Sequence, residues 1–136
     1  MVKVIIGLKG SGKTKQLIDS INTAIKTESG SMVCIEKGSA LTFDIDYRVR
    51  LIDASEYDIG DYTFLKGFIS GLHAGNFDIT HIFLDGLYKL SGSKDVEETA
   101  AFLAWAESFG AANNMKFTIT VSEDPANVSE DMKKYL

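Results

Sequence analysis

The sequence contains a single cysteine, a single proline and only two histidines among its 136 residues. With one cysteine no internal disulfide can form, and the apolar run around Cys34 predicts a buried strand residue rather than a nucleophile. His73 and His81 lack the spacing of metal ligands. These absences exclude a disulfide-stapled scaffold and a zinc site built on cysteine pairs.

Long apolar runs are also missing. No run approaches the roughly 18 residues that a membrane helix needs, and the N-terminal segment lacks the apolar core of a signal peptide. We therefore expect a cytoplasmic protein with no membrane partner. The net charge of −5, from 14 basic and 19 acidic residues, argues against nucleic acid as a partner. A local basic site stays open.

The length and the ordinary apolar content of 45% predict one domain that spans residues 1–136. Strand-like and helix-like segments alternate, which predicts an α/β fold: a three-layer sandwich with a mainly parallel sheet of about five strands and right-handed crossovers. We expect the strand at residues 2–6 to be central in the sheet. The other expected strands are 32–35, 47–52, 79–84 and 117–121, and the expected helices are 13–27, 61–75, 95–112 and a short one after Asp124.

Residues 7–14 read Gly-Leu-Lys-Gly-Ser-Gly-Lys-Thr and match the pattern G-x-x-x-x-G-K-[ST] at every fixed position. Glycines allow backbone N–H groups to wrap closely around a phosphate chain, and the following helix offers its free N–H groups and dipole. In this chemistry Lys13 reaches the β- and γ-phosphates, and the Thr14 hydroxyl takes one position on Mg²⁺.

On these residues the chain resembles a P-loop NTPase, with GLKGSGKT as Walker A and His-Ile-Phe-Leu-Asp at 81–85 as Walker B. The resemblance implies that Asp85 is the second Mg²⁺ anchor, because the carboxyl ends of parallel strands meet at one edge of the sheet. It also implies a set of nucleotide-binding residues: Gly7, Gly10, Ser11, Gly12, Lys13, Thr14 and Lys15, with Lys9 and Ser122 as further candidates.

The catalytic glutamate that many RecA-like ATPases carry after the Walker B aspartate is replaced here by Gly86. Glu36 and Glu123, each at the end of another expected strand, are the alternative candidates. The guanine-reading N-K-x-D is absent, which favours ATP without excluding GTP. The order of parts also resembles thymidine kinase, so a nucleoside kinase remains a minority alternative.

These patterns predict a Mg²⁺-dependent ATP-binding protein that is a slow or partner-activated ATPase. The alternative is a nucleotide-binding regulatory or interaction module that does not hydrolyse. Helix 95–112 is apolar on two faces, so it is either buried on both or contacts a protein partner or a second copy of the chain. Val96, Ala100 and Leu103 line one face, and Phe102, Trp105 and Phe109 line the other.

Overall fold

The computed structural model describes all 136 residues. It confirms an α/β fold in which five strands form one all-parallel sheet, in the order β1-β5-β4-β2-β3. The strands are β1 (Val2–Gly7), β2 (Ser31–Glu36), β3 (Val49–Asp53), β4 (Ile79–Asp85) and β5 (Lys116–Ser122). The helices are α1 (Lys13–Thr27), α2 (Tyr62–Gly75), α3 (Leu87–Ser91), α4 (Val96–Asn113) and α5 (Glu130–Lys133), with 3₁₀ turns at Ala54–Tyr57 and Pro125–Asn127.

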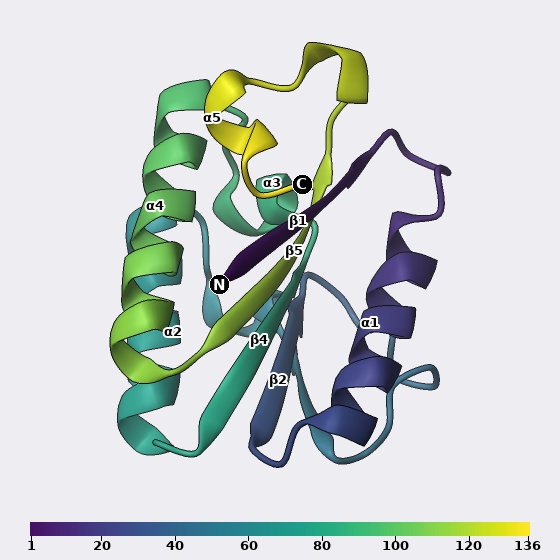
Figure 1. Cartoon of the computed structure of the whole chain (residues 1–136), viewed down its shortest axis with the longest axis vertical. Helices are drawn as coiled ribbons and strands as arrows, with labels where there is room; N and C mark the ends of the chain where they lie inside the picture. Colours follow the sequence, from purple (N-terminus) through teal and green to yellow (C-terminus); the bar gives the residue numbers. More distant parts are fainter.

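Helices cover both faces of the sheet, which gives the expected three layers (Figure 1). Helix α1 lies on one face, and its Leu17 and Ile21 pack with Cys34 and Phe83 of the central strands. Helices α2 and α4 lie on the other face over the larger apolar core. Burial on both faces explains why the strands read as continuous apolar runs rather than as alternating patterns.

The expectation that the first strand is central is wrong: β1 lies at an edge and pairs with β5 alone. Its apolar run reflects burial, because other parts of the chain cover this edge. The Val2 N–H donates to Glu107 of α4, and the Val4 N–H donates to the carbonyl oxygen of Tyr135 near the C-terminus. An edge strand that is covered in this way is as well shielded from water as a central strand. The hydrophobicity of its sequence therefore does not reveal that it lies at the edge of the sheet.

Several element boundaries agree with local signals and others do not. The Asp61 carboxylate accepts the Phe64 N–H at 2.6 Å and caps α2, and Asp95 caps α4 in the same way through Glu98. The short helix α3 was not expected, and β3 begins two residues later than predicted. None of the helices is both long and apolar enough to cross a membrane.

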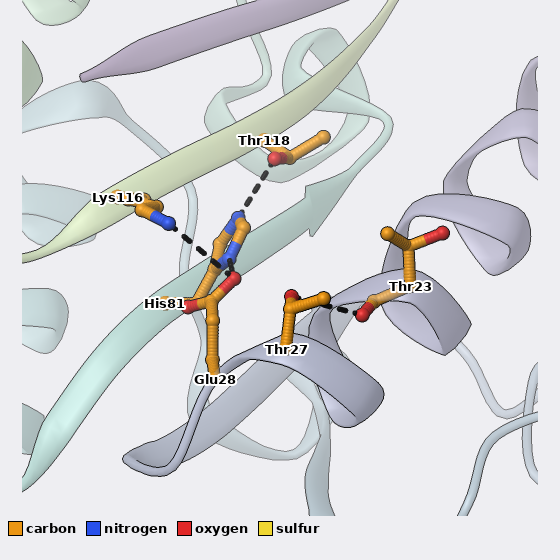
Figure 2. Close-up of polar contacts among 6 residues, drawn as sticks. All are labelled: Thr23, Thr27, Glu28, His81, Lys116 and Thr118. Atoms are coloured by element: carbon orange, nitrogen blue, oxygen red, sulfur yellow. Dashed lines mark hydrogen bonds and ion pairs between the residues drawn. The ribbon is translucent and has the colours of Figure 1, made fainter.

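A polar cluster joins the C-terminal end of α1 to the first residues of β4 and β5, at the sheet edge opposite the glycine-rich loop (Figure 2). Glu28 Oε2 lies 3.0 Å from His81 Nδ1 and 3.7 Å from Lys116 Nζ. His81 Nε2 lies 2.8 Å from the Thr118 hydroxyl. Neutral His81 satisfies both contacts if Nδ1–H donates to Glu28 and Nε2 accepts from Thr118. The cluster anchors the helix whose other end carries the loop.

Acidification should destabilise the fold through His81. Burial lowers the pKa of His81 below its ordinary value, and the hydrogen bond and charge of Glu28 only partly offset this. The unfolded chain therefore takes up the proton at a higher pH than the folded chain, so stability falls as pH drops through about 6.5. Urea unfolding at about pH 7.5 and about pH 5.5 should show a smaller loss for His81→Gln than for the wild type. His73→Gln controls for the removal of a histidine, and equal losses in the wild type and His81→Gln would contradict this assignment.

Candidate functional site

The glycine-rich loop between β1 and α1 has a backbone that other residues would strain. Gly10 and Gly12 have φ angles of +82° and +89°, in the left-handed region. A Cβ on Gly7 would collide with the hydroxyl of Ser11. Gly12 caps α1 without any side-chain hydrogen bond, and the first turn carries no acidic residue. The N–H groups at this end of α1 are therefore left for a ligand.

Lys13 and Thr14 open α1 directly after the loop. Lys13 Nζ donates to the carbonyl oxygen of Leu8 at 3.1 Å, so the side chain folds back over the loop. The Ser11 N–H donates to the same carbonyl oxygen at 3.0 Å and closes the turn. The ammonium group thus lies beside the loop backbone.

Asp85 stands at the carboxyl end of β4, across from the loop. Its Oδ1 accepts a hydrogen bond from the Thr120 hydroxyl at 2.7 Å, and that hydroxyl accepts the Gly86 N–H at 2.7 Å. Thr120 is buried. The threonine therefore orients the carboxylate from the neighbouring strand. In the sequence, Thr120 is only one of the threonines that alternate with apolar residues in β5. Nothing near it indicates that it contacts Asp85, although the alternation places its hydroxyl on a buried face.

Glu36 ends β2 and pairs in register with Asp85 of β4, so the two carboxylates are neighbours. Glu36 is only 4% exposed, and its Oε2 accepts the Leu41 N–H at 3.0 Å. Burial raises the pKa of Glu36, and the negative charges of Asp85 and Asp53 add to this, while the N–H groups of Leu41 and Ala40 oppose it. A carboxylate with a raised pKa holds a proton more readily at neutral pH than an ordinary glutamate does.

These groups line one cavity of about 550 Å³ at the carboxyl edge of the sheet, which we call the phosphate cavity. It lies where ligands bind in open parallel sheets. The sequence-predicted residues that line it are Lys9, Gly10, Gly12, Lys13, Thr14, Glu36, Asp85 and Ser122. The lining residues that sequence analysis missed are Lys37, Ala40, Gly86, Lys89 and Thr120.

Three predicted nucleotide-binding residues do not line the cavity. Gly7 lies beneath the loop and permits its close turn. Ser11 is an exposed loop residue. Lys15 lies on the solvent side of α1, where Lys15 Nζ is 3.3 Å from the Asp19 carboxylate. This arrangement directs Lys15 toward its own helix rather than toward the phosphate cavity.

Glu123, the other candidate glutamate, is engaged elsewhere. Its Oε2 accepts a hydrogen bond from the Tyr88 hydroxyl at 3.2 Å, and its Oε1 accepts the Asp124 N–H at 3.2 Å. Burial together with the Glu123 charge raises the pKa of Tyr88 to about 12. Glu123 does not line the phosphate cavity. Of the two candidates, only Glu36 lies beside Asp85.

The aromatic face of α4 packs largely within the molecule. Phe102 is buried and contacts Tyr62 of α2, with ring centroids 5.2 Å apart. Trp105 stacks on Phe109 with ring centroids 4.8 Å apart, and Phe109 and His73 form a T-shaped pair with centroids 5.7 Å apart. Helix α2 therefore covers much of this face. At the start of α4, Val96 is 60% exposed.

No family model matches the chain, and no curated protein matches it. The five-stranded parallel sheet is compatible with a P-loop NTPase but is not specific to that superfamily.

Proposed function

We propose that this chain binds Mg²⁺ and ATP in the phosphate cavity and is a slow or partner-activated ATPase. One observation carries the proposal. A glycine-rich loop with two left-handed glycines delivers Lys13 and Thr14 to the same cavity that Asp85 lines from a neighbouring part of the sheet. A loop that merely connects a strand to a helix needs neither the lysine nor the facing carboxylate.

The loop and the start of α1 bind the phosphate chain. Backbone N–H groups around Gly10 and Gly12 and those of the first turn of α1 donate to phosphate oxygens. Lys13 exchanges its hydrogen bond to the Leu8 carbonyl for a charged contact with the β- and γ-phosphates. The Leu8 carbonyl is a neutral acceptor, whereas a phosphate oxygen adds the attraction of opposite charges, so this exchange favours the bound state.

The donor set facing the loop suits Mg²⁺. The Thr14 hydroxyl and the Asp85 carboxylate are hard oxygen donors, and Mg²⁺ in phosphate sites takes one or two protein ligands together with phosphate oxygens and water. No group of three or more His, Cys, Asp or Glu side chains is arranged to hold a metal without a ligand. When bound, the ion neutralises charge on the phosphates. Thr120 keeps the Asp85 carboxylate turned to one orientation.

Glu36 is the group that would orient or deprotonate the attacking water, since it is the second carboxylate in the cavity wall. Its position also favours the second candidate function, a nucleotide-binding module without hydrolysis. The carboxylate is buried, one oxygen is already held by Leu41, and the pKa of Glu36 is raised. Such a group reaches an attacking water poorly unless a partner or a conformational change frees it, although the raised pKa makes it a stronger base once it has lost its proton.

The test is nucleotide-dependent stability. At about 100 times the dissociation constant, ATP with Mg²⁺ should raise the free energy of unfolding by about 2.7 kcal/mol. Removing the metal with EDTA should weaken the effect, because Asp85 then faces the phosphates without a bridging cation. Thermal unfolding with ATP, ADP, GTP and GDP measures affinity and base preference. No stabilisation by any of the four at millimolar concentration would rule out the proposal.

Phosphate release then separates the two candidate functions, and adding nucleosides tests the kinase alternative. A kinase would form ADP faster when its nucleoside is present, whereas an ATPase would release inorganic phosphate without it. A chain that binds ATP tightly, releases no phosphate alone and does not increase the phosphate release of a cell extract is the non-hydrolysing module.

A further inference from the structure

A second cavity of about 260 Å³ adjoins the phosphate cavity, and we call it the annex. Gly86, Lys89 and Ser122 line both cavities. Tyr88 and Lys94 line the annex but not the phosphate cavity. The two cavities are therefore neighbours, with Ser122 and Lys89 at the boundary between them.

The annex is lined by cations and hydroxyl groups and by no carboxylate. Neither Lys89 nor Lys94 has an ion-pair partner, and both side chains are exposed to solvent. The carboxylate that Tyr88 contacts, Glu123, already accepts hydrogen bonds from the Tyr88 hydroxyl and the Asp124 N–H. Two ammonium groups and the Ser122 hydroxyl are thus available as donors to an anion.

The charge distribution of the whole chain also favours an anion as the ligand of the annex. The protein has 19 acidic and 14 basic residues, yet five of the basic residues and only two of the acidic ones line the two cavities. A concave region of net positive charge within a protein of negative net charge attracts anionic ligands. The basic residues are Lys9, Lys13, Lys37, Lys89 and Lys94, and the acidic ones are Glu36 and Asp85.

We propose that the annex binds the phosphate or carboxylate group of a second small molecule, beside the terminal phosphate of the bound nucleotide. The volume equals roughly nine water molecules of liquid, which leaves room for a small metabolite rather than for a bare ion alone. The location beside a bound nucleotide rests on the proposed function. The anion preference of the annex rests on Lys89, Lys94 and Ser122 themselves.

The experiment uses the full chain saturated with Mg²⁺ and the non-hydrolysable β,γ-imido analogue of ATP, so that the site of the terminal phosphate is already filled. Orthophosphate and succinate are then titrated separately at constant ionic strength, orthophosphate by ³¹P NMR and both anions by calorimetry. We expect at least one of them to bind with a dissociation constant in the millimolar range. Lys94→Ala should weaken that binding about tenfold or more, because it removes a charged donor. Binding of the analogue itself should stay unchanged.

Lys26→Ala is the matched control, since Lys26 is an exposed lysine in the last turn of α1 and lines neither cavity. It should leave anion binding intact. Binding of neither anion at up to about 20 mM, or equal binding by wild type and Lys94→Ala, would overturn the annex proposal. If the analogue itself does not bind, the proposed function fails. In that case, anion titration of the nucleotide-free protein and of its Lys94→Ala variant still tests the annex proposal. An anion site that depends on Lys94 can be detected without nucleotide.

Discussion

Lys13→Ala should remove most of the stabilisation that ATP and Mg²⁺ confer on this protein. The Lys13 ammonium is the charged group that the loop holds beside the phosphate site, and its loss is expected to weaken binding about a hundredfold. At a nucleotide concentration that gives the wild type about 2.7 kcal/mol, the variant would retain only about 0.4 kcal/mol. Thermal unfolding with and without nucleotide measures both values.

The variant should remain folded without nucleotide, because Lys13 makes a single hydrogen bond, to the Leu8 carbonyl of its own loop. Lys15→Ala provides a matched control two residues away. Lys15 has the same charge and lies on the same helix, but it pairs with Asp19 and does not line the phosphate cavity. If Lys15→Ala weakened binding as much as Lys13→Ala, general electrostatics rather than a phosphate contact would explain both losses.

The parts of the fold and site that sequence predicts are those set by local rules. Some features can be recognised from a few neighbouring residues: a glycine in the left-handed region such as Gly12, an aspartate helix cap such as Asp61, and a strand that is buried on both faces. The joint location of Lys13 and Asp85 also follows, because every strand of a parallel sheet ends at the same edge.

What could not be predicted depends on contacts between distant segments. The edge position of β1 could not be predicted because Glu107 and Tyr135 cover this edge, and no local sequence pattern indicates that either residue does so. Thr120 orients the Asp85 carboxylate, which lies 35 positions earlier in the sequence. Lys89 becomes part of the site only because the short helix α3 follows β4 directly, and a lone lysine in such a helix reads as an ordinary surface residue.

The position of Glu36 leads to the prediction with the largest expected effect on turnover. The isolated chain should hydrolyse ATP well below 1 s⁻¹, the lower end of ordinary enzyme turnover. Only two arginines are present in the sequence, and the one candidate base is buried, with one of its oxygens already held by the Leu41 N–H. A trans-acting arginine is worth about 10³–10⁵ in rate in this chemistry, so a partner could supply the missing charge. Several turnovers per second from the isolated chain would contradict this part of the prediction.

Glu36→Gln should slow phosphate release by a further factor of about a hundred or more, the usual contribution of a general base. Glutamine keeps the shape of the side chain, and its carbonyl oxygen can still accept the Leu41 N–H, so the loop after β2 should stay in place. Nucleotide affinity should therefore change little while the rate falls. Glu123→Gln is the control, since Glu123 is held by Tyr88 away from the cavity and should keep the wild-type rate.

The pH dependence distinguishes a base from a structural carboxylate. Burial raises the pKa of Glu36, so the side chain loses its proton at a higher pH than an ordinary glutamate does. Because only the deprotonated carboxylate can act as a base, the wild-type rate should rise with pH as Glu36 loses its proton. Glu36→Gln should lack this rise, because its amide does not titrate. If the two proteins show parallel pH profiles, or if the variant keeps the wild-type rate, Glu36 does not act on the water. Its contact with Leu41 would then be its whole role, and the base would have to come from a partner.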